Sequence, residues 1–217
     1  MSTDKTLQND VQSELNWEPR VNAAHIGVSA HAGVVTLTGY VENYAEKNAA
    51  EKAAWRVKGV KGIAEELEVR LPNSIKRSDE QIAEAALSRM SWDVSIPNNS
   101  ITVKVQDGYV TLTGEVPYYY QKEAAEHSVR GLFGVTGVSN QTTLKSRVNT
   151  SDISDSIRTA LHRSWLFDPD TVTVNADGGK VKLGGTVNSW HDREVAGRTA
   201  WAAKGATQVE NHISVVF

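Results

Sequence analysis

The sequence predicts an α+β protein made of three tandem domains, each with the element order α-β-β-α-β. Two observations lead to this prediction. A strand motif bounded by glycines occurs three times, as Gly33–Gly39, Gly108–Gly114 and Gly179–Gly185, at steps of 75 and 71 residues. Around each copy, the spacing of apolar residues changes from the period of a helix to that of a strand and back again.

The repeat is long enough for each copy to be a domain of its own, since solenoid repeats span only roughly 20 to 50 residues. We expect the domains at residues 1–73, 76–146 and 150–217. A domain of this size buries only about 60% of the surface of its unfolded chain. The connecting segments, residues 71–77 and 145–150, are too short to be free tethers, so the domains should be close neighbours.

Each domain should begin with an amphipathic helix, because apolar residues recur at i, i+4 and i+8 near its start. In the second copy, Ser78 followed by Gln81 is the pattern of a capping box at the helix N-terminus. The residues expected to face the core are Leu7, Val11 and Leu15 in the first copy, Ile82, Ala86 and Met90 in the second, and Ile157, Leu161 and Trp165 in the third.

A β-hairpin should follow, because apolar and polar residues alternate on both sides of a glycine-containing turn. The turns are residues 31–33, 106–108 and 177–179. The core-facing residues of the first strand are Ile26, Val28 and Ala30, then Ile101, Val103 and Val105, then Val172, Val174 and Ala176. Those of the second strand are Val35, Leu37 and Val41, then Val110, Leu112 and Val116, then Val181, Leu183 and Val187.

An Ala-rich helix and a last strand complete each copy, giving a three-stranded mixed sheet with two helices on one face. Small residues let this helix lie close to the sheet. Its predicted inward residues are Ala49, Ala53 and Val57, then Ala124, Ser128 and Leu132, then Val195, Thr199 and Ala203. Those of the last strand are Ile63, Leu67 and Val69, then Val138 and Leu144, then Val209, Ile213 and Val215.

The glycine strand, the Ala-rich helix and the Gly-Val-x-x-Val entry to the last strand resemble the BON domain, in three copies in register. The third copy departs from the pattern, with Gln208 where the others have Gly62 and Gly137. The resemblance implies a domain without catalytic activity of its own. Such domains occur in osmotic-shock and other envelope-stress proteins, secretins and channel-associated proteins. The resemblance also implies the phospholipid-surface binding that has been proposed for the family.

The resemblance places the family's characteristic glycine at Gly39, Gly114 and Gly185. These glycines lie at inward parity on a strand, where we expect a side chain to strike the helix above. Glycine within a strand usually marks close backbone approach or a bulge. A structural role is therefore expected for all three, and no role in ligand binding.

An aromatic residue and an acidic residue recur just past the first helix of each copy. We expect the aromatic residues Trp17, Trp92 and Phe167 to close the end of the core. The neighbouring acids are expected to serve as turns or caps, because acid–base catalysis needs paired groups in one site and the repeats hold them in separate places. These acids are Glu18, Asp93 and Asp168.

Trp55 is a candidate surface residue, because it lies two residues after the inward Ala53, a helical rotation of about 200°. Trp201 takes the same place in the third copy, and Arg130 takes it in the second. Both tryptophans are therefore predicted to be exposed. Exposed indoles suit packing between domains, a partner or second copy, or a membrane interface.

Tyr118 and Tyr120 are further candidates for an apolar surface at the start of the second helix of copy two. Tyr119 between them has aromatic counterparts in Tyr44 and Trp190, so we expect a structural role for it. The alternative for Tyr118 and Tyr120 is that they are ordinary exposed tyrosines.

The chain carries no motif of an enzyme or a metal site. It has no cysteine, which excludes disulfides, thiolate metal sites and cysteine nucleophiles. Its six histidines form no H-x-x-x-H pair, and phosphate-binding, nucleotide-binding and serine-hydrolase motifs are absent. We therefore expect no catalytic residues, no cofactor and no metal.

Charge argues against nucleic acid as a partner. The net charge of the chain is −3, and residues 1–75, 76–147 and 148–217 carry −2, 0 and −1. No copy has the basic balance that neutralises phosphates. The same count weakens simple electrostatic attachment to anionic lipid.

The N-terminal residues are the basis for predicting the cellular compartment. It has no basic segment followed by an apolar run, which a secretory signal would have, although relatives of the osmotic-shock type usually carry a signal peptide. Nowhere do about eighteen apolar residues occur together, as a membrane-spanning helix requires. We expect a cytoplasmic protein if Met1 is the native start, and a periplasmic one if the sequence is a trimmed form.

The expected function is that of a non-catalytic, stress-associated binding and assembly protein. Its exposed helix faces would contact a protein partner or another copy of the chain. One alternative is a module that binds phospholipid or another envelope surface. Another is a sensor of an ion or small molecule, or a transport-associated protein, with its ligand held in a cleft between domains.

Overall fold

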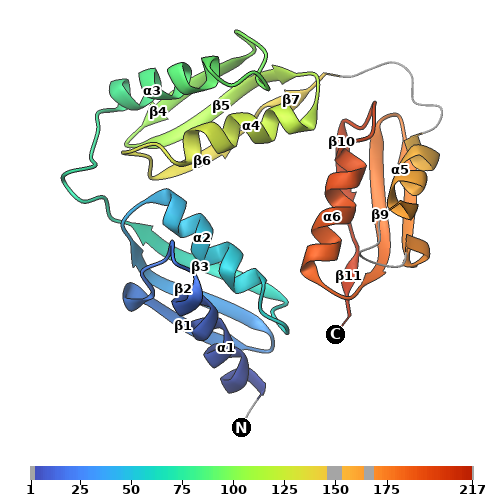
Figure 1. Ribbon diagram of the computed structural model, residues 1–217, viewed down its shortest axis with the longest axis horizontal. Coiled ribbons are helices and arrows are strands. Elements are labelled where there is room, and N and C mark those ends of the chain that lie inside the picture. Colours follow the sequence, from blue (N-terminus) through green and yellow to red (C-terminus); the bar gives the residue numbers. More distant parts are fainter. Residues whose placement is uncertain (1–2, 146–152, 164–168, 217) are drawn as a thin grey trace. The chain divides into compact units, whose positions relative to one another are not determined.

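All three repeats fold with the predicted order of elements in the computed structural model, which describes residues 3–145, 153–163 and 169–216 (Figure 1). The contacts of the chain divide it into two compact units. The first comprises residues 1–114 and 122–142, and the second comprises residues 115–121 and 143–217.

The first repeat contains a three-stranded mixed sheet in the order β1-β2-β3. The β1–β2 pair is antiparallel and the β2–β3 pair is parallel, as a hairpin followed by a helical crossover requires. Its elements are α1 (Thr3–Trp17), a 3₁₀ turn (Ala23–His25), β1 (Ile26–His31), β2 (Val34–Val41), α2 (Tyr44–Trp55) and β3 (Gly62–Val69).

The other repeats keep this topology, but their last strand is divided in two. The side-chain oxygen of Asn140 accepts the N–H of Thr142, and that of Asn211 accepts the N–H of Ile213, so the chain turns locally at both places. The second repeat has α3 (Asp79–Ser91), β4 (Ile101–Gln106), β5 (Tyr109–Val116), α4 (Tyr119–Arg130), β6 (Gly137–Asn140) and β7 (Thr143–Leu144). The third has α5 (Ile153–His162), a 3₁₀ turn (Pro169–Thr171), β8 (Val172–Asp177), β9 (Lys180–Val187), α6 (Trp190–Trp201), β10 (Gln208–Asn211) and β11 (Ser214–Val215).

The first helices and the second strands of the hairpins bury the residues that their spacing predicts, whereas four residues predicted for the first strands, Ala30, Val103, Val105 and Ala176, are only half-buried. Every described residue predicted to face inward from a first helix is buried, and so is every one predicted for the second strands; Trp165 lies outside the described residues. The capping box of Ser78 and Gln81 is present at the start of α3. Both helices of the first repeat share one apolar cluster with the sheet, so they cover the same face.

The second helix of each repeat also buries a stripe one residue later than predicted, while Ala49, Ala53 and Ser128 of the predicted stripe are buried as expected. Its most deeply buried residues include Ala50 and Ala54, Ala125 and Val129, and Ala196 and Ala200. The first turn of the helix explains this rotation. The third residue of the helix is a buried polar residue whose side chain is turned inward, and this fixes the rotation of the whole helix. These buried polar residues are Glu46, Gln121 and Asp192.

The recurring glycines are required by the backbone, but not for the reason that the sequence suggests. Gly39, Gly114 and Gly185 have φ values of +111°, +138° and +101°, a region that L side chains rarely adopt. A Cβ at Gly114 would lie 2.1 Å from the carbonyl oxygen of Ser100. The predicted clash with the helix is therefore wrong, because the obstacle is the backbone just before the neighbouring strand.

Gly114→Ala should destabilise the protein by about 2–4 kcal/mol, because it combines an unfavourable φ with a backbone clash. Urea unfolding measures this as a fall in the transition midpoint. Gly131→Ala is the matched control in the same repeat, since nothing lies within 4 Å of a Cβ at that position. Equal effects of the two substitutions would contradict this explanation.

Candidate interaction surfaces

Trp17 and Trp92 are the most exposed large aromatic side chains that the structure describes, at 82% and 85%. The prediction that they close the core is wrong. Each lies two residues after a buried residue of its helix, Leu15 or Met90, and the resulting rotation of about 200° turns the indole to solvent. The same rotation, applied to these positions, would have predicted their exposure. The third member, Phe167, lies outside the described residues.

An open groove of about 480 Å³ lies beside Trp17, between α1 and the end of α2. Acidic and basic side chains line it together with the indole. Its lining residues are Asp10, Ser13, Glu14, Trp17, Val57 and Lys58. The groove therefore offers an apolar ring with charges of both signs around it.

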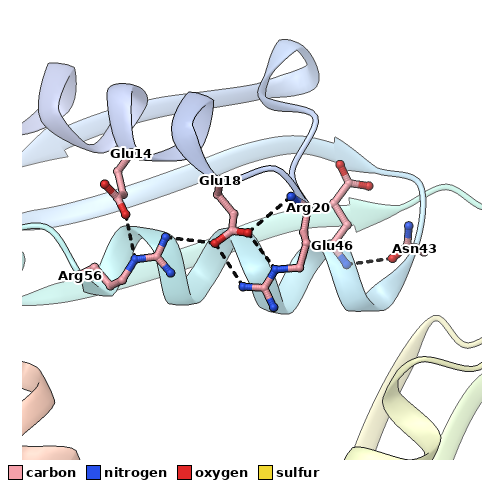
Figure 2. A network of polar contacts seen from close by, with 6 residues as sticks. All are labelled: Glu14, Glu18, Arg20, Asn43, Glu46 and Arg56. Atoms are coloured by element: carbon pink, nitrogen blue, oxygen red, sulfur yellow. Dashed lines mark hydrogen bonds and ion pairs between the residues drawn. The ribbon is translucent and has the colours of Figure 1, made fainter.

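A network of ion pairs joins the C-terminal turn of α1 to the end of α2 beside this groove (Figure 2). Glu18 is 6% exposed and accepts hydrogen bonds from Arg20 Nε at 2.8 Å and from Arg56 Nη2 at 3.1 Å. Arg56 Nε also donates to Glu14 at 2.8 Å. The hydrogen bond from Arg20, helped by that from Arg56 and opposed by burial, lowers the pKa of Glu18 from 4.5 to about 2.

The recurring acids also have the turn role that the sequence predicts. Glu18 accepts the backbone N–H of Arg20, and Asp93 accepts that of Ser95 at 2.8 Å, so each acid holds the N–H two residues later. The hydrogen bond from Ser95 lowers the pKa of Asp93. Glu18 and Asp93 belong to different repeats and serve separate turns, and Asp168 lies outside the described residues.

Glu18→Gln should lower the free energy of unfolding at neutral pH, because Arg20 loses its ion pair and Arg56 keeps only the one with Glu14. Since folding lowers the pKa of Glu18, the stabilisation is complete above about pH 4.5 and is lost as the pH falls towards 2. The difference between wild type and variant should therefore shrink over that range in urea unfolding. The control, Glu84→Gln on the exposed side of α3, should show little difference at any pH. A wild-type advantage that is constant down to pH 2 would contradict the assignment.

The predicted surface residues Trp55 and Trp201 are half-buried rather than exposed, and Arg130 is half-buried as well. Each follows the last deeply buried residue of its helix, so it lies on the flank of the buried face and not opposite to it. Trp55 packs partly against the core of the first repeat. The ring of Trp201 stacks on Tyr119, with centroids 4.2 Å apart, and both belong to the second compact unit.

Among the described residues, the second repeat carries the largest set of exposed large apolar side chains. Tyr118 and Tyr120 are 36% and 55% exposed and stack on each other at 5.6 Å. The other members lie on α3, after α3, on β5 and after α4. They are Leu87 at 51%, Trp92 at 85%, Val94 at 103%, Tyr109 at 48% and Phe133 at 64%.

Histidine, aspartate and glutamate side chains form no group of three or more that could hold a metal ion within the described ranges. Over the same ranges, no helix is both long and apolar enough to cross a membrane.

Comparison with known proteins identifies a family and a relative. The BON domain model matches residues 3–70, 78–146 and 149–216. Osmotically-inducible protein Y of Escherichia coli (strain K12) is 29% identical over 141 residues, which cover 63% of this chain and 70% of that protein.

Two solved structures of CdsD, a structural protein of the type III secretion system of Chlamydia trachomatis, are also similar. The C-terminal domain is 15% identical and aligns over 97% of this chain and 98% of its own. The second structure is 14% identical and aligns over 97% and 92%. Both have a TM-score of 0.28, which does not establish a shared arrangement of the whole chain.

Proposed function

Because the chain belongs to the BON domain family through three consecutive domains, we propose that it is a non-catalytic, stress-related protein that acts by association, first of all with copies of itself. Its similarity to an osmotically inducible protein supports the relation to stress. The observation that carries the association is the exposure of Trp17 and Trp92 at equivalent places in two repeats.

Burial of these exposed indoles against another molecule would be favourable in free energy, which supports their role as a contact surface. A tryptophan side chain is one of the largest apolar groups and dominates the energetics of interfaces where it is buried. Trp17 stands beside an open groove with charged residues around it, which resembles the apolar centre and polar rim of protein interfaces. Trp92 lies two residues before the exposed Val94, so the second repeat also has exposed apolar side chains at this place.

The double variant Trp17→Ala/Trp92→Ala should reduce self-association, measured by size-exclusion chromatography with light scattering over a range of concentrations. Its free energy of unfolding should stay within about 0.5 kcal/mol of wild type, because both indoles are exposed. Val34→Ala, which shortens an exposed apolar side chain on β2 of the first repeat, is the control and should change neither property. A wild type that is monomeric at every concentration would overturn the proposed self-association.

A phospholipid surface is the second candidate, because tryptophan is favoured at membrane interfaces. Flotation with anionic and zwitterionic vesicles distinguishes lipid binding from self-association. Wild type that floats while the double Trp variant does not would favour the lipid function. The low net charge of each repeat predicts little difference between the two vesicle types.

A further inference from the structure

The first strand of each sheet is an edge strand, and the repeats differ in how its free edge is covered. In the first repeat, Gln8 Nε2 of α1 donates to the carbonyl oxygen of Val28 at 2.7 Å. In the third repeat, Arg158 Nη2 of α5 donates to the carbonyl oxygen of Val174 at 3.1 Å. A helix side chain thus occupies the hydrogen-bonding edge of both strands.

The second repeat lacks this cover. Val103 pairs with Leu112 in the same register as Val28 with Leu37, so its carbonyl group also points to the free edge. The helix residue at the place of Gln8 and Arg158 is Ala83, which has no side-chain donor. Within the described residues, no helix side chain covers the edge of β4 as in the other repeats, so its main-chain groups can pair with another strand.

The helix flank above this edge is apolar only in the second repeat. Ala83 and Leu87 are four residues apart on α3 and so lie on one side of it. The residues at the place of Leu87 are Gln12 in the first repeat and His162 in the third. Leu87 is 51% exposed, and it lines an open groove of about 550 Å³ together with Ile96 and Ile101.

We propose that β4 pairs in an antiparallel manner with β4 of a second copy of the chain, which joins the sheets of the two second repeats. This inference rests on the proposed self-association and adds the β4 edge to the exposed tryptophans as a contact surface. With Val103 opposite its own symmetry mate, Ile101 lies opposite Val105 on the core face and Thr102 lies opposite Lys104 on the other face. This register buries only apolar pairs between the sheets and keeps the two lysines apart, whereas a shift that places Lys104 opposite itself is repulsive.

The packing of the helices agrees with this pairing. Since α3 lies over β4, two paired β4 strands bring the flanks with Ala83 and Leu87 towards each other. A small residue at position 83 leaves room for this approach. The Gln or Arg of the other repeats would stand in the interface and occupy the strand edge, so the first and third repeats are not expected to pair in this way.

The substitution Ala83→Arg tests the proposal, because it installs the residue that covers the edge in the third repeat. Arginine is a good helix former, so the fold should be retained, and urea unfolding checks this. Light scattering should show wild type with the mass of two chains and Ala83→Arg with the mass of one. Leu87→Gln, which copies Gln12 of the first repeat, should weaken the dimer in the same direction.

Ala85→Arg is the matched control, since Ala85 is exposed on α3 and lies about 200° away from Ala83. This variant should dimerise as wild type does. A dimer that survives Ala83→Arg would overturn the β4 interface, while a loss of association in the Trp variant would still support the proposed function. A wild type that stays monomeric at every concentration would overturn both.

Discussion

Each repeat depends on the burial of a single sheet face beneath two helices. A three-stranded sheet offers one apolar face, and each helix can cover it with only one stripe of residues. The stripes of α1 and α2 meet the sheet in one cluster that contains Leu15, Leu37 and Ala54. Whatever lies opposite to a stripe must face water, and so the rotation of the helices decides which large side chains are left on the surface.

The elements themselves could be predicted from the sequence, because each follows from a local period and a turn. The rotation of the second helix could not, since Ala-rich segments such as Ala49–Ala54 offer two adjacent stripes of similar apolarity. In α2 both stripes are buried, and the buried Glu46 fixes this rotation: it accepts the N–H groups of Asn22 and Glu42 at 2.8 and 2.9 Å, and Asn22 is far away in sequence. This error of one residue moved Trp55 from the predicted exposed side to the flank.

The acidic residues after the first helix show how one position can serve different purposes in different copies. Glu18 and Asp93 hold the same backbone turn, but their contacts with the second helix differ. Glu18 is ion-paired with Arg56, whereas Gly131 takes the place of Arg56 in the second repeat and Asp93 accepts a hydrogen bond from Ser128 Oγ at 3.4 Å instead. The edge strands differ in the same way. A shared fold with local differences in polar side chains gives the three repeats different surfaces, and only the second has both an uncovered strand edge and an apolar flank among the described residues.

Hydrogen–deuterium exchange of the three edge strands, measured at low and high protein concentration, tests this division most directly. Amide groups on the free edge of β4 should gain protection as the concentration rises, because the paired strand removes them from water. The corresponding amides of β1 and β8 should exchange at rates that do not depend on concentration. Equal behaviour of the three strands, with or without a concentration effect, would contradict the account.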